Sequence, residues 1–220
     1  GQLRGWLEVA LVCALMPIGG ILGALTGFAP MGAIGAVVPS LLAASYLLHR
    51  EGNSWRGIVL QRVLPAGKVM AYCGMALAGG YAVVILSNIV LRLLGFSGPN
   101  VSGLSSILSG NLTMYLWFLI PVAWGSAAIG EELISRGFLL HRIETLVGTA
   151  PANVLQATIF ALAHSYQGIS GVISIFFLAL VFGAVFMRSG RNLLPIILAH
   201  GIIDTIGLTV VYLGYADQIS

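Results

Sequence analysis

Six ionisable side chains lie within stretches of sequence that are otherwise apolar. They are Glu131, Glu132, Arg136, His164, His200 and Asp204. Ionisable groups are costly in an apolar environment, so those that occur there commonly serve a function. Carboxylates and imidazoles exchange protons during catalysis, and a guanidinium holds a carboxylate by charge and hydrogen bonds. The set therefore has the groups needed for acid–base chemistry, provided that the fold brings them together.

Spacing along the chain indicates which of these groups share a helix face. Glu132 and Arg136 are four residues apart, as are His200 and Asp204, and residues at this spacing are neighbours on an α-helix. We expect Arg136 to form an ion pair with Glu132. Glu131 lies about 100° away around the helix and is then free to react. We expect Asp204 to orient the imidazole of His200.

The composition indicates what kind of element carries these residues. The chain has 220 residues, of which 58% are hydrophobic and only 8% are charged, and its mean hydropathy is +0.99. A soluble domain has about 25% charged residues and cannot hide so much apolar surface. These totals exclude a soluble enzyme, a secreted disulfide scaffold and a disordered chain, and they predict a polytopic membrane protein.

Apolar stretches of about 20 residues are long enough to cross a bilayer as helices. Seven such stretches cover approximately 6–27, 31–48, 69–93, 112–141, 150–166, 169–187 and 193–213. None shows the alternation of membrane-spanning strands, so the sequence predicts an all-α transmembrane helix bundle. We expect about seven helices, or eight if residues 130–147 form their own. We also expect a single integral membrane domain over 1–220, with the polar set within 112–213.

Depth in the membrane provides a test of whether the polar groups can meet. A helix rises about 1.5 Å per residue, which places four of the groups about 13 to 21 Å from the cytoplasmic ends of their helices. These four are Glu131, His164, His200 and Asp204. A hydrocarbon core is about 30 Å thick, so we expect them to line one cavity at mid-membrane. Phe160 shares a helix face with His164 and is expected to pack beside its ring.

Basic residues predict how the bundle lies in the membrane. With the N-terminus inside, nine of the ten Lys and Arg residues fall on the inner side, and Arg92 alone lies towards the outside. The nine are Arg4, Arg50, Arg56, Arg62, Lys68, Arg136, Arg142, Arg188 and Arg191. Cytoplasmic loops are enriched in such residues. We therefore expect a cytoplasmic N-terminus, an external C-terminus and no nucleic-acid partner; a prokaryotic cell membrane is the location implied by the family resemblance given below.

A stripe of small residues follows the first apolar stretch at helical spacing. Gly19, Gly23 and Gly27 are each four residues apart, and such stripes let helices approach closely in lipid. Packing within the chain is the favoured interpretation, and a dimer interface is the alternative. The sequence leaves the oligomeric state open.

Taken in order, the polar residues form three motifs. They read Glu131-Glu132-Leu-Ile-Ser-Arg136, Phe160-Ala-Leu-Ala-His164 and His200-Gly-Ile-Ile-Asp204. This arrangement resembles the CPBP family (CAAX protease and bacteriocin-processing, or Abi) of intramembrane endopeptidases, which is similar to the type II CAAX prenyl endopeptidases. That family carries E-E-x-x-x-R, F-x-x-x-H and H-x-x-x-N or D on separate transmembrane helices. The resemblance covers roughly residues 112–213, about half of the chain.

The resemblance implies hydrolysis of a peptide bond inside the membrane. By position, Glu131 and His164 would activate a water molecule, and His200 with Asp204 would form the oxyanion site. The supporting residues would be Glu132, Arg136 and Phe160. The implied substrate is a membrane-associated peptide or a leader peptide, and CAAX-like peptides are included. The implied mechanism needs no cofactor.

Asp204 departs from the prenyl endopeptidase branch, which has asparagine at this position. An ionised aspartate cannot donate a hydrogen bond to an oxyanion, whereas asparagine can. Asp204 is therefore expected either to be protonated or to hold His200 in one tautomer. We favour the second interpretation.

Other functions for the same residues stay open. Two histidines with two or three carboxylates could bind zinc, although the chain has no H-E-x-x-H motif. A proton-coupled transporter could use the groups as a relay, although no inverted repeat or pair of broken helices is evident. A catalytically silent membrane scaffold is a further alternative, as is a purely structural buried network. The complete set of motif positions favours the protease.

Overall fold

The computed structural model describes residues 1–215, and its architecture is all-α, as the sequence predicts. Within that range no β-strand forms, and a single β-bridge joins Leu60 to Asn192. Among the described residues, six helical segments are long and apolar enough to cross a membrane. They are α1 (Gln2–Ala24), α2 (Pro30–Arg50), α4 (Ala66–Leu93), the composite segment Leu112–Val147, the segment Ser165–Arg188 that contains α9 (Gly168–Arg188), and α10 (Leu194–Tyr212).

Helix α8 (Thr149–Ala163) is shorter than the span expected over 150–166. Its 15 residues extend about 22 Å, which is less than the hydrocarbon thickness of about 30 Å. The helix ends at His164, where the chain enters the short 3-10 helix η3 (Ser165–Gln167). Gly168 follows with φ of +77°, a conformation that glycine adopts without steric strain. The turn places His164 directly after the last residue of α8.

Two short helices lie in the loops between spans. Helix α3 (Trp55–Val59) begins at Ser54, whose hydroxyl accepts a hydrogen bond of 3.2 Å from the backbone N–H of Gly57. Helix α5 (Ser102–Leu108) precedes the composite segment. That segment begins at Asn111, whose side chain accepts from the N–H of Met114 at 3.1 Å. Both caps satisfy backbone donors that a helix start leaves unpaired.

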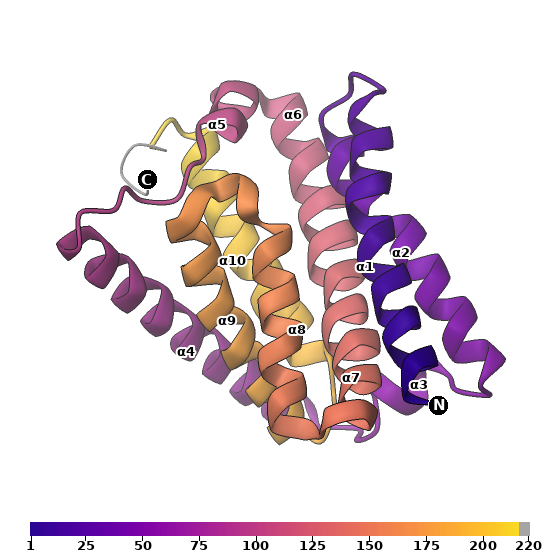
Figure 1. Ribbon diagram of the computed structural model, residues 1–220. Coiled ribbons are helices and arrows are strands. Elements are labelled where there is room, and N and C mark those ends of the chain that lie inside the picture. The colour runs from indigo at the N-terminus through magenta and orange to yellow at the C-terminus, as the bar shows by residue number, and fades with distance from the viewer. Residues whose placement is uncertain (216–220) are drawn as a thin grey trace.

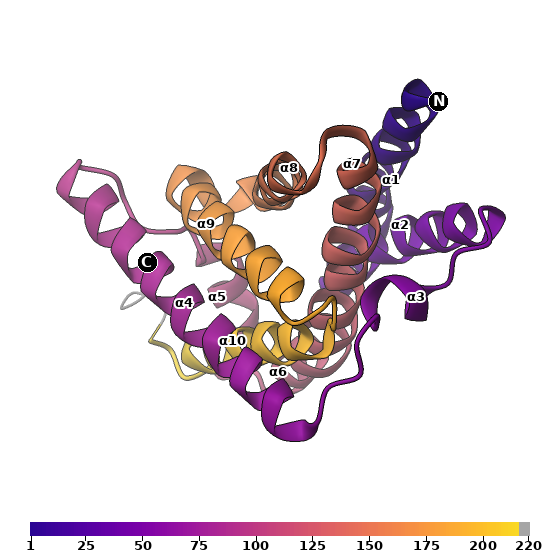
Figure 2. The same cartoon turned by 90° about the horizontal axis from the view of Figure 1, so that it is seen from below.

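Figure 1 shows the helices in three groups. Helices α1 and α2 form an outer pair, the composite segment lies in the middle, and α4, α8, α9 and α10 form the other side. The view from below shows the same separation (Figure 2). The composite segment packs against α2 on one side and α10 on the other. Its side chains can therefore reach both outer groups.

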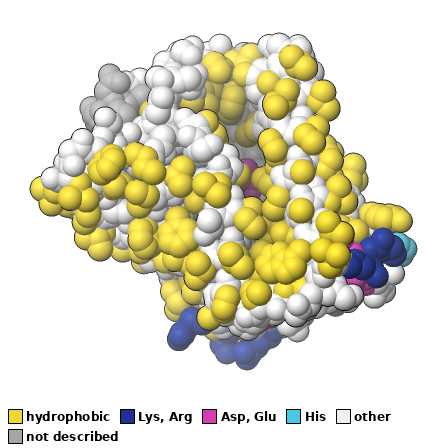
Figure 3. Space-filling model, in the orientation of Figure 1, with side chains coloured by type: hydrophobic (Ala, Val, Ile, Leu, Met, Phe, Trp, Pro, Cys, Tyr) yellow, Lys and Arg dark blue, Asp and Glu magenta, His cyan; other side chains and the backbone are white. Residues whose placement is uncertain are grey.

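The outer surface of the bundle is apolar along the helices. Ile21, Leu42 and Leu86, from three different spans, are 63%, 65% and 63% exposed. Figure 3 shows apolar side chains over most of one face, with Lys and Arg gathered at its lower end. Extended exposed apolar surface of this kind marks contact with a membrane. With six long apolar helices, the chain is an integral multi-pass membrane protein.

Glycines let α1 and α2 touch at their backbones. A Cβ atom on Gly19 would overlap the carbonyl oxygen of Gly35, and one on Gly23 would overlap that of Met31. Gly27, in contrast, lies in the turn after α1 with φ of +74° and nothing near its Cβ position. The first two glycines of the stripe therefore serve packing within the chain, which is the interpretation that the sequence favoured.

The composite segment is the least regular helix. It begins as α6 (Leu112–Trp117), continues as the π-helices η1 (Phe118–Glu131) and η2 (Leu133–Leu139), and ends as α7 (Leu140–Val147). Pro121 lies within η1 and has no backbone N–H to donate. The chain continues through 130–147 without a break, so no separate eighth span forms there. The first motif lies on this widened helix, and π-helical turns are frequent at functional sites.

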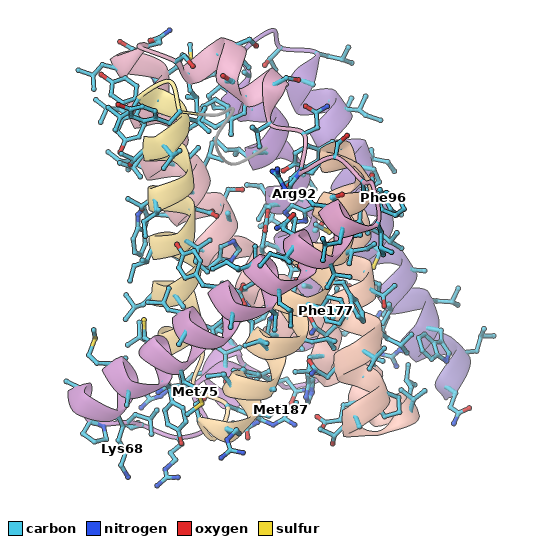
Figure 4. All side chains as sticks on the ribbon, turned by 90° about the vertical axis from the view of Figure 1, so that its left-hand side faces the viewer. Lys68, Met75, Arg92, Phe96, Phe177 and Met187 are labelled. Carbon is cyan, nitrogen blue, oxygen red and sulfur yellow. The ribbon has the colours of Figure 1, made fainter. Side chains whose placement is uncertain are left out.

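Helix α4 crosses the outside of the four-helix group at a slant. Figure 4 shows Lys68 near one end of the bundle and Arg92 towards the other. The hydroxyl of Tyr72 on α4 donates a 3.0 Å hydrogen bond to the carbonyl of Arg188 at the end of α9. Further along, the hydroxyls of Ser87 and Ser174 are 3.0 Å apart. These contacts hold α4 against α9 at two levels.

A cluster of charged residues joins α1, α2 and α7 at the end of the bundle where the described chain begins. Glu8 is only 5% exposed and accepts from Arg4 at 2.9 Å and from Arg50 at 2.7 Å. Glu51 accepts from Arg142 at 2.6 Å. Burial alone would raise the pKa of Glu51, but Arg142, with Arg4 and Arg50, holds this pKa below its ordinary value of 4.5. The cluster ties the composite segment to the α1–α2 pair.

Candidate active site

Glu132 is the centre of a buried polar cluster. Its side chain is fully buried, as is that of Arg136. The Oε1 atom of Glu132 accepts a hydrogen bond of 2.9 Å from Nη1 of Arg136 and one of 2.8 Å from Nδ1 of His200. The ion pair expected from the spacing of Glu132 and Arg136 is therefore present, on a π-helical stretch. One oxygen atom joins the first motif to the third.

Arg136 is held from several sides. Its Nη2 atom donates a 3.2 Å hydrogen bond to the carbonyl of Ala179 on α9. Its guanidinium carbon lies 4.7 Å from the ring centroid of Phe160 and 5.5 Å from that of Phe182, which are cation–π distances. The distribution of basic residues predicts Arg136 on the inner side of the membrane. This is corrected here, because Arg136 is buried within the bundle, where Glu132 balances its charge.

Phe160 connects the second motif to the other two. Its ring centroid lies 4.8 Å from that of His164 and 6.2 Å from that of His200. The Nδ1 atom of His164 lies 2.8 Å from the carbonyl oxygen of Phe160. Because a carbonyl only accepts, Nδ1 carries the hydrogen, and a neutral ring then keeps Nε2 as an acceptor. His164 is half-buried, so this ring lies at the edge of the cluster.

His200 faces a carboxylate at each ring nitrogen, and the closer one is not the neighbour on its own helix. Nε2 lies 3.6 Å from Oδ2 of Asp204, which is beyond hydrogen-bond length. Nδ1 makes the 2.8 Å hydrogen bond to Glu132. The imidazole is thus oriented by the hydrogen bond that Glu132 accepts from it, whereas Asp204 lies at ion-pair distance. The sequence shows spacing within a helix but cannot show this contact between helices.

Glu131 lies beside the cluster but outside its hydrogen bonds. Its Oε2 atom is buried and has no hydrogen-bond donor among the described residues. Its charge acts on Arg136, His200 and Asp204, so it lies within electrostatic range of all three. Within the same part of the chain no hydrogen bond joins Glu131 to His164. Glu132 also has a buried Oε2 atom without a donor, but its Oε1 atom is bonded to Arg136 and His200.

A hollow opens on the face of the bundle that carries this cluster. Figure 3 shows it between the α8–α9 hairpin and the composite helix, with an acidic side chain visible at its floor. Glu131 and Asp204 are both partly exposed, whereas Glu132 is not. The network of Glu132 is therefore shielded, while two further carboxylates are open to a ligand.

Comparison with known families agrees with the three motifs. Residues 113–206 match the family model of the Rce1-like type II CAAX prenyl endopeptidases. The resemblance to CAAX proteases is confirmed over this segment. The Rce1-like segment covers a little under half of the chain and contains every motif residue. No curated protein and no solved structure matches this chain.

Within the Rce1-like segment, polar residues of α8 support the backbone carbonyl to which Arg136 donates. The Nε2 atom of Gln156 lies 3.4 Å from the carbonyl of Ala179, which also accepts from Arg136, and 2.9 Å from Oδ1 of Asn153. Gly183 leaves room for Asn153, because a Cβ there would overlap its Oδ1. In the sequence, Asn153 and Gln156 can be noticed because they are polar residues in an apolar stretch. Ala179 cannot be noticed in this way, because it contributes only its backbone carbonyl.

Trp124 on η1 packs against α10. Its Nε1 atom donates a 3.1 Å hydrogen bond to Oγ1 of Thr205. A Cβ on Gly201 would lie 2.6 Å from the indole ring, so only glycine permits this approach. Gly201 and Thr205 directly follow His200 and Asp204 in sequence. The contact therefore sets the height and rotation of the third motif.

The cluster does not fit a zinc site. Among residues 1–215, no group of three or more His, Cys, Asp or Glu side chains is placed to hold a metal ion. The Nδ1 atom of His200 is bonded to Glu132, and that of His164 to a backbone carbonyl. Protein zinc sites need three or four converging ligands. The zinc alternative is thus not supported by this geometry.

Proposed function

We propose that this chain is an intramembrane endopeptidase that hydrolyses a peptide bond with a water molecule activated by Glu131 and His164. The proposal is supported by one observation above all. Three motifs far apart in sequence converge at Phe160 and Arg136, with Oε1 of Glu132 held by two donors and Oε2 of Glu131 left without one. The Rce1-like match over residues 113–206 supports a protease.

In the proposed reaction Glu131 is the general base. Its carboxylate takes a proton from water while the water oxygen forms a bond to the carbonyl carbon of the substrate. The tetrahedral intermediate collapses as the C–N bond breaks, and the proton passes to the leaving amine. His164 positions the water, because its Nε2 atom can accept a hydrogen bond from the water while Nδ1 is bonded to the carbonyl of Phe160. The role of the two residues in this step is a prediction from their placement.

His200 and Asp204 are proposed to serve the developing oxyanion. Glu132 accepts the Nδ1 hydrogen of His200, which turns the Nε2 edge towards Asp204. A proton on both nitrogens would be stabilised by the hydrogen bond to Glu132, and Nε2–H would then donate to the oxyanion. Asp204 acts here as a polar neighbour of the Nε2 edge and not as a donor. Glu132, Arg136 and Phe160 are the positioning residues.

The proposed substrate is a membrane-associated peptide that reaches the hollow from the lipid or from the inner surface. A peptide with a prenylated cysteine, as the family description names, is one candidate. A leader peptide without a lipid is the other. We propose a prokaryotic cell membrane as the location, with the N-terminus cytoplasmic, the C-terminus outside and residues 1–220 as one membrane domain.

Proteolysis by the purified protein tests this function. Internally quenched peptides with a prenylated or an unmodified cysteine near the C-terminus would be incubated with wild type, Glu131→Gln and His164→Ala in lipid nanodiscs. We expect cleavage by wild type and a loss of at least about 100-fold in both variants. Cleavage that persists in Glu131→Gln would contradict the assignment. A parallel reaction with chelator should proceed unchanged, and loss of cleavage there would favour a metal-dependent protease.

A further inference from the structure

Tyr166 lies beside His164 at the turn between α8 and α9. The two ring centroids are 5.9 Å apart and the planes are inclined by 33°. The ring centroid of Phe160 lies 4.8 Å from that of the same imidazole. Yet Tyr166 is 71% exposed, so it is not a packing residue of the core. It is a large side chain with a reactive hydroxyl at the edge of the candidate site.

The turn that carries Tyr166 is fixed by hydrogen bonds. The N–H of Gln167 donates to the carbonyl of His164 at 3.0 Å, and the N–H of Asn100 donates to the carbonyl of Gln167 at 2.9 Å. The hydroxyl of Ser170 donates to the carbonyl of Ser97. The loop before α5 thus holds the turn from outside. The backbone at Tyr166 consequently keeps a defined position relative to His164.

The hydroxyl of Tyr166 has one hydrogen-bond partner among the described residues and feels the charge of two carboxylates. Its oxygen accepts a 3.3 Å hydrogen bond from Nε2 of Gln167. The hydroxyl is within electrostatic range of Glu131 and Asp204, the two partly exposed carboxylates of the site. A phenol both accepts and donates. With its oxygen held by Gln167, its hydrogen is available to a group that binds over His164.

We propose that Tyr166 is a further catalytic residue, whose hydroxyl donates a hydrogen bond to the carbonyl oxygen of the scissile peptide bond. This inference rests on the proposed endopeptidase function. As water adds to the carbonyl carbon, its oxygen gains negative charge, and a donor aimed at it stabilises the transition state more than the substrate. The phenol keeps its proton throughout.

Tyr166 supplies a kind of donor that its neighbours lack. An ionised Asp204 has no hydrogen to donate, and a neutral His164 bonded through Nδ1 presents only an acceptor. His200 donates from Nε2 only when both ring nitrogens carry hydrogen. A neutral hydroxyl can stabilise the oxyanion in either charge state of His200. The site thus gains a donor that does not depend on that proton.

Tyr166→Phe tests the inference because it removes only the hydroxyl and keeps the ring against His164. With the quenched prenylated peptide, we expect kcat to fall about 10- to 100-fold while KM changes by less than about twofold. Tyr46→Phe is the matched control, since Tyr46 is 65% exposed on α2 beside Arg50. It should leave both constants unchanged. Thermal unfolding in detergent should be the same for both variants and wild type.

The possible outcomes separate this inference from the function on which it rests. Wild-type kcat in Tyr166→Phe would overturn the role of the hydroxyl and leave the endopeptidase standing. A raised KM with unchanged kcat would also overturn it, because Tyr166 would then bind the ground state and the transition state equally. If wild type cleaves neither the prenylated nor the unmodified peptide, the proposed function fails and this inference fails with it.

Discussion

The Nδ1 atom of His200 lies 2.8 Å from the Oε1 atom of Glu132, although the two residues are 68 positions apart. The same oxygen accepts from Arg136 at 2.9 Å. Oε1 of Glu132 therefore has two donors that hold it in place, although the Oε2 atoms of both Glu131 and Glu132 are buried without a donor among residues 1–215. The two glutamates thus differ at one oxygen, which fits the proposal that Glu132 holds the site and Glu131 reacts.

Isosteric replacement of the two glutamates should separate these roles. Glu132→Gln removes the charge that balances the buried Arg136, so we expect the free energy of unfolding to fall by about 3–5 kcal/mol. Glu131→Gln breaks no hydrogen bond and should change it by less than about 1 kcal/mol. Denaturation of both variants in the same detergent gives the comparison. Equal destabilisation would show that Glu131 also holds the structure.

Asp204 should tolerate a polar replacement better than an apolar one. Asp204→Asn keeps a polar oxygen near the Nε2 atom of His200, now 3.6 Å from Asp204, and should retain peptide cleavage. Asp204→Leu removes every polar atom from that side of the ring and should lose it. Cleavage rates with the quenched peptide provide the measurement. An equal loss in both variants would mean that the negative charge itself is required.

Neighbouring glycines of α1 should respond differently to alanine. Gly19→Ala places a Cβ against the carbonyl of Gly35 and should destabilise the protein by about 1–3 kcal/mol through forced separation of α1 and α2. Gly20→Ala is the control, because its Cβ would lie 3.5 Å from that of Ala36, an ordinary contact. It should be neutral or slightly stabilising. Thermal unfolding of the two variants distinguishes them, and equal values would contradict this packing.

Acid should remove the stabilisation that Glu51 provides. Its pKa in the folded protein lies below the ordinary value of 4.5 because Arg142, Arg4 and Arg50 outweigh the opposing effect of burial. A lowered folded pKa contributes stability that is complete above the unfolded pKa and is lost as pH falls through the folded one. Wild type should therefore be more stable than Glu51→Gln at pH 7. In melting curves the difference should begin to shrink as pH falls below 4.5 and should vanish once pH lies below the folded pKa, and a constant difference would refute the linkage.

The sequence predicted well those features that depend on one segment at a time. The long apolar stretches predicted α1, α2, α4, α9 and α10, and the four-residue spacing predicted the ion pair of Glu132 with Arg136. It predicted a span over 150–166, whereas α8 ends at Ala163 and residues 165–167 form the 3-10 helix η3. Hydropathy is averaged over many residues and does not report the residue at which a helix ends.

Contacts between helices could not be predicted in the same way. The spacing paired His200 with Asp204, but the shorter contact is with Glu132 on another helix. Arg136 was counted as an inner-side residue, yet it is buried between Phe160 and Phe182. The hydrogen bond from Arg136 to the carbonyl of Ala179 could not be predicted, because every residue type has a backbone carbonyl. These features depend on the rotation and height of each helix.

By itself the sequence therefore determined that this chain is an all-α membrane protein and which few polar residues lie inside it. Apolar length and the cost of buried charge are properties of single segments, so they can be read without coordinates. Only the tertiary structure decided which oxygen holds His200, which glutamate is held by two donors, and that Tyr166 lies beside His164. Hydrogen bonds depend on distances of a few tenths of an ångström, and packing between helices sets those distances.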